Sequence, residues 1–379
     1  MSSGYRPVLR LPGAAAFFFT AAVGRTGIAM TGLGLLWLFH ARAGSYGTAG
    51  LATAGFALAE GVLGPQVARL TDRFGQTRVL PFSVAAHGIA VAGVLTAPPP
   101  VAVAFAACAG AAVPQLGALS AARWAHLLRG TGHLPAAFSL ESLANATAFL
   151  LGPVLVTALG AAGYAPLAST LAAVLVVGGG AALATQRRTA PPPARPGRPL
   201  RRVRFVRLAL LNVAVGLYFG TMGVSVSAFA TQHGVPGAAA PIVAAASIGG
   251  LVSGWHYGLR RHRAPARLQL VAAAAYLTGT AFLPPLAPSA LWLGAAVVVT
   301  EAAIPPTLVL LNVLTETTVD PAVRTQAFTW NNSASAAGSA LAAFVSGHIA
   351  DALGASAAFA LAPAAGLALL VLSVALPSE

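Results

Sequence analysis

The chain alternates long apolar segments with short polar or charged breaks along its whole length. A helix that crosses the hydrocarbon core of a membrane needs about 20 apolar residues, because each residue advances it by about 1.5 Å. Twelve segments have about that length: 12–39, 47–67, 79–97, 101–122, 137–159, 164–186, 206–229, 238–259, 268–286, 289–314, 327–349 and 356–376. The pattern predicts an all-α membrane protein with twelve transmembrane helices.

Composition supports this class of protein. Of the 379 residues, 57% are hydrophobic and 8% are charged, whereas a soluble domain carries about 25% charged residues. So few charges cannot cover a water-soluble fold of this length. The first apolar segment is also too long for a cleavable signal peptide. All 22 basic residues are arginine, and this usage, rich in alanine and glycine, is typical of a GC-rich, actinobacterial type of genome.

The arginines indicate the orientation of the chain. If the N-terminus is cytoplasmic, 20 of the 22 arginines lie in cytoplasmic segments, Arg42 lies outside and Arg25 lies within a helix. Cytoplasmic loops carry such an excess of basic residues. We therefore expect both termini in the cytoplasm, and we interpret the net charge of +14 as a signal of topology and of contact with anionic lipids, not of nucleic-acid binding.

A polar segment divides the chain near its midpoint. Residues 187–207 contain eight arginines and five prolines, which favour an extended segment in water. We expect a cytoplasmic linker here, between a six-helix half at 1–186 and a second at 208–379.

The two halves resemble each other in sequence. Residues 137–139, Ala-Phe-Ser, match 327–329, Ala-Phe-Thr, at a distance of 190 residues. Two further matches have nearly the same spacing: Arg78 with Arg267, and Pro114-Gln115-Leu116 with Pro306-Thr307-Leu308. A common spacing of half the chain is typical of duplicated halves, so we expect them to be pseudo-symmetric.

The loop between the second and third apolar segments carries a distinct motif, with Asp72, Arg73, Gly75 and Arg78. Gly75 permits the positive φ that a tight reversal needs. Arg73 and Arg78 hold the loop at the inner surface. Asp72 is the loop's one carboxylate, and it can accept hydrogen bonds from a helix N-terminus or an arginine. An ordinary basic turn is the alternative interpretation.

This loop resembles the signature loop of the major facilitator superfamily of secondary transporters. Ala68 and Thr77 depart from the family pattern, in place of a glycine and a basic residue. The twelve segments and the duplicated halves extend the resemblance over essentially the whole chain. It implies the superfamily fold, transport by alternating access, and a latch in which Asp72 joins the halves at the start of the eleventh helix.

A second marker is Gly152-Pro153 in the fifth segment. The resemblance extends here to proton-coupled drug antiporters, which carry Gly-Pro at this place. The surrounding glycines of that motif are missing, and so is the superfamily's arginine within the fourth segment. The marker favours export, and a simple bend for helix packing is the alternative.

Five polar residues lie within the predicted helices and are candidates for binding substrate or protons: Arg25, Glu60, Glu141, Glu301 and Asn331. A charge at mid-membrane costs about 2.5–3.5 kcal/mol on insertion scales, so each needs a partner or water. Glu301 and Glu60 are the main candidates for carrying protons. The alternative for Glu301 is a static ion pair with Arg25, and for Asn331 a hydrogen bond to a neighbouring helix.

We therefore expect a monomeric transporter in a bacterial plasma membrane, which drives efflux of a small organic molecule with protons. No nucleotide-binding loop, cofactor motif or metal-ligand spacing is present in the sequence, and the eight acids show no catalytic spacing, so an enzyme is not expected. Proton-coupled uptake and a transport-inactive sensor or scaffold are the alternatives.

The predicted topology can be tested with reporter fusions at Arg195 and Pro99. Because the arginines place the first in the cytoplasm and the second outside, we expect a cytoplasmic reporter to be active only at Arg195. Activity of the same reporter at both sites would contradict this topology.

Overall fold

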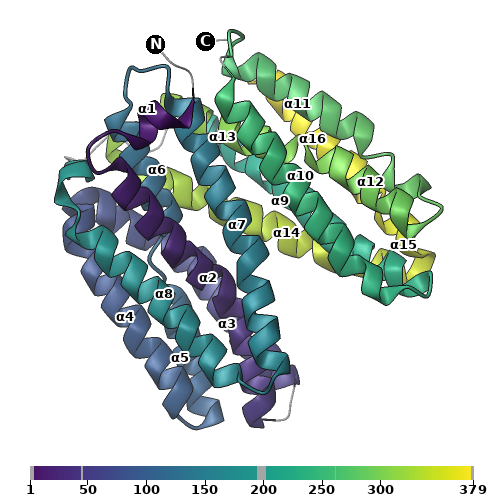
Figure 1. Ribbon diagram of the computed structural model, residues 1–379, viewed down its shortest axis with the longest axis horizontal. Helices are drawn as coiled ribbons and strands as arrows, with labels where there is room; N and C mark the ends of the chain where they lie inside the picture. The colour runs from purple at the N-terminus through teal and green to yellow at the C-terminus, as the bar shows by residue number, and fades with distance from the viewer. Residues whose placement is uncertain (1–3, 44–45, 194–201, 261, 377–379) are drawn as a thin grey trace.

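The computed structural model describes residues 4–43, 46–193, 202–260 and 262–376, and every regular element in these ranges is helical (Figure 1). Helices form because lipid offers no partner for the backbone, so each N–H and C=O group must bond within its own segment. The helices are α1 (Tyr5–Leu9), α2 (Ala14–Ala43), α3 (Tyr46–Phe74), α4 (Gln76–Thr96), α5 (Pro99–Ala111), α6 (Leu116–Leu127), α7 (Leu134–Ala161), α8 (Ala165–Thr185), α9 (Arg202–Gln232), α10 (Ala239–Leu259), α11 (Ala266–Thr280), α12 (Ala290–Glu301), α13 (Ile304–Thr318), α14 (Arg324–Leu353), α15 (Ala355–Ala358) and α16 (Leu361–Val374).

Eleven of the described segments are long and apolar enough to cross a membrane. Helix α3 is long enough, with 29 residues, but it is less apolar because its sequence includes Glu60, Arg69 and Asp72. It packs beside α2 and α5 and takes the place of the twelfth span. The predicted all-α fold is thus confirmed.

The helices pack into two groups with the same pattern of neighbours. In the first group α2 contacts α7 and α8, and α4 contacts α8; in the second, α9 contacts α14 and α16, and α11 contacts α16. Helix α9 begins at Arg202, inside the expected linker, because the residues beyond Pro199 are free of proline. Residues 194–201, which include Arg195, lie outside the described residues.

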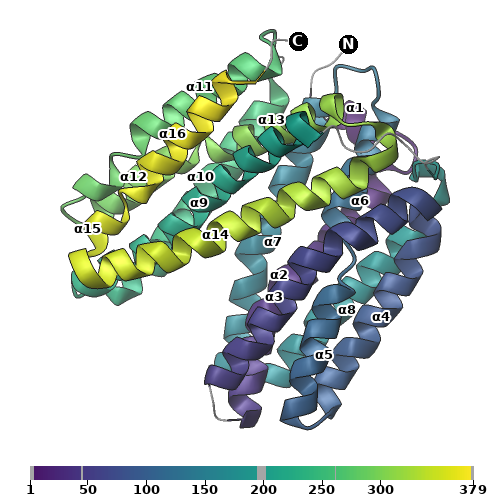
Figure 2. The same ribbon diagram turned by 180° about the vertical axis from the view of Figure 1, so that it is seen from behind.

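The two groups meet at one end of the molecule and diverge toward the other (Figures 1 and 2). The main helix pairs that join them are α3 with α14, α6 with α14, α7 with α10, and α7 with α13. We refer to the end where the groups meet, and where both chain ends lie, as the closed end, and to the other as the open end.

Matched residues of the two repeats touch each other at this junction. The rings of Phe138 on α7 and Phe328 on α14 lie edge to face, with centroids 5.9 Å apart. They pack with Val309 of α13 and with alanines of α6 in a buried cluster that joins the halves. The contact of equivalent positions places this cluster close to the axis that relates the repeats.

The fourth and tenth segments, each predicted as one continuous helix, are both broken. The first break, at residues 112–115, separates α5 from α6, and the second, at residues 302–303, separates α12 from α13. Pro114 and Pro305 cause these breaks, because proline has no N–H to donate. The breaks occupy equivalent positions in the repeat, and side chains bond the freed carbonyl groups: Ser83 donates to Ala112 O at 2.7 Å, and Ser253 to Ala302 O at 2.5 Å.

Glycines bring α9 and α14 into close contact. A Cβ atom added at Gly216 or Gly220 would collide with the backbone carbonyl groups of Ser335 or Ser339 on α14. Gly223, on the same helix, has open space at this position. Close approach of this kind lets backbones pack where the hydrophobic effect contributes little between helices.

We expect Gly216→Ala to lower the stability of the protein by about 1–3 kcal/mol, because the added methyl group forces the two helices apart. Gly223→Ala is the matched control, and it should be neutral or stabilise by about 0.4–1 kcal/mol. Thermal unfolding of the purified variants in detergent measures both effects, and equal melting temperatures would contradict the close packing of α9 on α14.

Candidate functional site

Asp72 joins the two halves at the closed end. It lies near the end of α3, and its carboxylate accepts hydrogen bonds from the backbone N–H groups of Thr325, at 3.2 Å, and Gln326, at 2.9 Å. These groups belong to the first turn of α14, where backbone N–H groups have no partner within the helix and the helix dipole attracts negative charge. A carboxylate of one half therefore caps a helix of the other.

An ion pair reinforces this junction from the side of the second half. Arg324, the first residue of α14, is buried and pairs with Glu316 near the end of α13. Arg324 also interacts electrostatically with Asp72. The cation therefore interacts with two carboxylates, one from each half.

The rest of the loop motif supports the turn rather than the junction. Gly75 has φ of 91° and precedes α4, as its predicted role requires. Arg73 and Arg78 are exposed, and the guanidinium of Arg73 lies 5.2 Å from the ring of Phe74. Pro193 packs on Gly75, so the start of the linker lies against this loop.

Arg25 pairs with Glu141, and the alternative pairing with Glu301 is wrong. Both residues belong to the first half, on α2 and α7, and both are buried. Glu141 Oε1 also accepts hydrogen bonds from Ser120, at 2.5 Å, and Trp124, at 2.8 Å. Because α2 packs on α7, the guanidinium reaches this carboxylate, whereas Glu301 belongs to the second half.

Glu60 and Glu301 form no ion pair with any residue in the described ranges. Glu60 is partly buried on α3, about 18 Å along the helix from Asp72. Glu301 is also partly buried, at the last residue of α12, directly before the break. Tyr218 of α9 interacts electrostatically with Glu301, and its hydroxyl is buried with no hydrogen-bond partner.

Asn331 and the Gly-Pro marker both take part in helix packing. Asn331 is buried and donates to Thr315 Oγ1 of α13 at 2.8 Å. A Cβ atom added at Gly152 would lie 3.0 Å from Ala29 Cβ, so the glycine lets α7 approach α2 closely. Helix α7 continues through Pro153 without a break.

Arg123 was not among the candidate site residues, because in the sequence it is only one of the 20 arginines in predicted cytoplasmic segments. It is fully buried on α6, and it donates to Gln76 Oε1 at 2.8 Å, Thr189 Oγ1 at 2.8 Å, and the carbonyl oxygens of Leu183, at 3.0 Å, and Gln186, at 2.9 Å. The negative end of α8 thus replaces an acidic partner. Through Thr189, this arginine holds the start of the linker against the first half.

Three further arginines bond helix C-termini in the same manner. Arg42 donates to the last carbonyl groups of α4 at 2.6 and 2.7 Å, and Arg207 and Arg267 donate to those of α16 at 3.1 and 2.5 Å. Arg42, the exception to the predicted orientation, therefore has a local structural partner.

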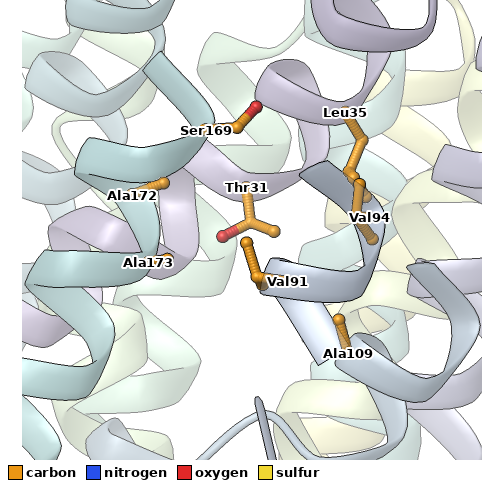
Figure 3. A pocket seen from close by; sticks show the side chains of 8 residues that line it. All are labelled: Thr31, Leu35, Val91, Val94, Ala109, Ser169, Ala172 and Ala173. Carbon is orange, nitrogen blue, oxygen red and sulfur yellow. The ribbon is translucent and has the colours of Figure 1, made fainter. Parts of the chain in front are cut away.

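An apolar pocket lies inside the first half, lined by Thr31, Leu35, Val91, Val94, Ala109, Ser169, Ala172 and Ala173 (Figure 3). Its two hydroxyl groups are already bonded: Thr31 donates to Gly27 O at 2.9 Å and Ser169 to Gly34 O at 3.2 Å. With no free polar group, the pocket is a packing gap rather than a binding site.

The sequence matches the family profile described as Major Facilitator Superfamily over residues 17–343, most of the chain. The chain belongs to the Major Facilitator Superfamily. It is therefore a multi-pass membrane protein that transports a solute. No curated protein matches the sequence significantly.

Solved structures share this superfamily fold at low sequence identity. A bacterial homologue of the iron transporter ferroportin in its outward-facing state has a TM-score of 0.79 at 12% identity, covering 95% of this chain and 98% of that one. The transporter FucP in its outward conformation has 0.76 at 12%, covering 98% and 100%. The human organic anion transporter MFSD10 has 0.70 at 16%, covering 95% and 98%. Such identities support the fold alone.

The geometry predicts how the Arg25–Glu141 pair contributes to stability. Glu141→Gln leaves a buried guanidinium without its counter-ion, so we expect a loss of about 3–5 kcal/mol and a lower yield of folded protein. Adding Arg25→Gln removes the stranded charge and should restore much of the loss. Thermal unfolding of the single and double variants measures this, and simple additivity of the two single effects would contradict the pairing.

Proposed function

We propose that this superfamily transporter exports a small organic molecule from the bacterial cytoplasm in exchange for protons. The observation that carries the proposal is Glu301, a carboxylate without an ion-pair partner in the described residues, at a helix break in the second half. In a medium of low dielectric, an unpaired carboxylate is stable only when it is protonated, hydrated or bound to a ligand. A proton carrier must change between these states in each transport cycle.

In this proposal, the arginines indicate which end of the molecule faces the cytoplasm. The closed end holds the chain termini and most of the arginines, so we assign it to the cytoplasm of a bacterial plasma membrane. The conformation is then outward-facing. Rocking of one half against the other would open the cytoplasmic side, and for that the contact of Asp72 with α14 must break.

Export rather than uptake is favoured by the resemblance of Gly152-Pro153 to the marker of proton-coupled drug antiporters, although this glycine also serves the packing of α7 on α2. Counterflow in inverted vesicles distinguishes the directions, because an antiporter accumulates substrate when protons leave the vesicle, whereas a symporter loses it.

The proposed carrier is tested by Glu301→Gln, which keeps the shape of the side chain but removes its titration. We expect proton-driven accumulation in inverted vesicles to be abolished, while downhill exchange of substrate survives. Normal proton-driven accumulation in this variant would remove Glu301 as the carrier and leave Glu60 as the candidate.

The proposed latch is tested by Asp72→Asn. The change removes the charge from hydrogen bonds that are worth about 1.5–3 kcal/mol, so we expect the inward-facing population to rise at least tenfold. Val309→Cys in a Cys108→Ser background reports this opening, because Val309 is fully buried in the junction. Its labelling from the cytoplasmic side should accelerate in Asp72→Asn.

The control for the latch is Asp320→Asn. Asp320 caps a short turn before α14 through Ala322 N, at 2.9 Å, and has no bond across the halves. Equal labelling rates in the two variants would show that Asp72 belongs to an ordinary turn.

A further inference from the structure

Only some of the charged side chains inside the transmembrane helices have an ion-pair partner. Among the described residues, four charged side chains lie at least seven residues from either end of their membrane-spanning segment: Arg25, Glu60, Glu141 and Glu301. Arg25 and Glu141 neutralise each other and are at most 8% exposed. The remaining two are both acids, one in each half, and both are partly accessible.

These two acids lie at similar depth. Glu60 precedes the end of α3 by 14 residues and Glu301 precedes the end of α13 by 17, which corresponds to about 21 and 25 Å from the closed end. Measured in the same way, the break before α6 lies at a comparable depth. A polar layer thus crosses both halves beyond the junction that closes the cytoplasmic side.

Further polar side chains lie near these acids. Gly64 of α3 faces both Gln115, in the first break, and Thr329 of α14. Glu60 is one turn before Gly64 on the same face of α3, and Asn332, which is exposed, is one turn beyond Thr329 on α14. Glu60 and Asn332 therefore lie next to this contact, on the side toward the open end.

An independent observation marks the acid of the second half. The hydroxyl of Tyr218 lies in the interior with no hydrogen-bond partner, on a side chain that is fully buried, and it interacts with Glu301. An amine bound at Glu301 would give it a partner, whereas an onium ion, which has no hydrogen-bonding group, would not.

We propose that the substrate is an organic cation, such as an amine or a quaternary onium ion, which Glu60 and Glu301 bind through their carboxylates. An anion would face two uncompensated negative charges, and Arg25 cannot bind it because Glu141 occupies its guanidinium. A carboxylate takes up either a proton or a cation, so proton release on cation binding conserves charge. This inference rests on the proposed function and specifies its substrate class.

The test uses two probes of the same shape and opposite charge, tetraphenylphosphonium and tetraphenylborate. Binding of each is measured by equilibrium dialysis with the purified protein in nanodiscs, after subtraction of empty nanodiscs. We expect saturable binding of tetraphenylphosphonium only, weakened at least tenfold in Glu60→Gln and in Glu301→Gln and lost in the double variant. Asp351→Asn, an equal change of charge at an exposed site near the open end of α14, should leave it unchanged.

Three results would overturn the inference: no saturable binding of the cation to folded protein, saturable binding of the anion, or equal cation binding in Glu60→Gln, Glu301→Gln and the unchanged protein. The melting temperature of each variant shows that it is folded. The assay contains no ion gradient, so a protein that binds the cation but does not couple its movement to protons contradicts the proposed function and leaves this inference standing.

The short helix α1 contacts the second half at another place. Tyr5 belongs to the apolar core of the first half, but its hydroxyl donates to Trp255 O of α10 at 2.7 Å, with Gly254 O at 3.3 Å. The rings of Tyr5 and Trp255 are 4.5 Å apart. Burial raises the pKa of Tyr5 to about 12, so the hydroxyl keeps its donor proton at neutral pH.

This contact lies where α10 crosses α7, the counterpart of the crossing of α3 and α14. A Cβ atom added at Gly258 would collide with the Tyr5 hydroxyl and with Ser139 of α7, so α10, α7 and α1 are in close contact. The geometry points to α1 as a second clamp of the closed end, formed by Tyr5 on the side opposite Asp72. Opening toward the cytoplasm must break both contacts.

Tyr5→Phe tests the clamp, because it keeps the ring and removes the hydrogen bond. With the same Val309→Cys reporter, we expect labelling from the cytoplasmic side to accelerate about fivefold, as for the loss of one hydrogen bond of about 1 kcal/mol. Tyr164→Phe is the control, at an exposed tyrosine. An unchanged labelling rate in Tyr5→Phe would overturn the clamp.

Discussion

A charge in the hydrocarbon of a membrane must be paired, hydrated or removed by a proton, and this constraint organises the structure. Arg25 satisfies it with Glu141, and Arg123 satisfies it with the carbonyl groups at the end of α8. The same condition at the closed end is met by Asp72 on the first turn of α14. Each of these contacts joins separate helices, so the compensation of charge is also what fixes their relative positions.

The two halves repeat their helix packing but not their charges. The crossing of α3 with α14 has a carboxylate on a helix N-terminus, whereas the equivalent crossing of α10 with α7 has a phenol on backbone carbonyl groups. Ion pairing is confined to Arg25 in one half and Arg324 in the other within the described ranges. The two crossings are therefore equivalent in position but differ in their hydrogen-bonding groups, so the contact at one crossing can be stronger than the contact at the other.

The sequence predicts the helices well and their pairing less well. Apolar length alone locates all twelve segments, because the thickness of the membrane imposes it. The contact of Asp72 with the start of α14 was expected from the resemblance of its loop, and the geometry contains it. The pairing of Arg25 with Glu141 depends on which faces of α2 and α7 pack together. Both helices are apolar on all sides, so hydrophobic periodicity does not predict those faces. The prolines matched between the repeats, Pro114 and Pro306, lie at the two breaks and are visible in the sequence, whereas nothing local to Tyr5 indicates its contact with α10.

The contact of Phe138 with Phe328 has a mechanical consequence. Two positions related by a twofold axis are separated by twice their distance from it, so rings 5.9 Å apart lie about 3 Å from the axis of the repeat. Because the pair lies in the junction of the closed end, together with Val309, opening of that end must separate the two rings. Each ring is then left without the same partner, so the loss of either one favours the open state of this end to a similar degree.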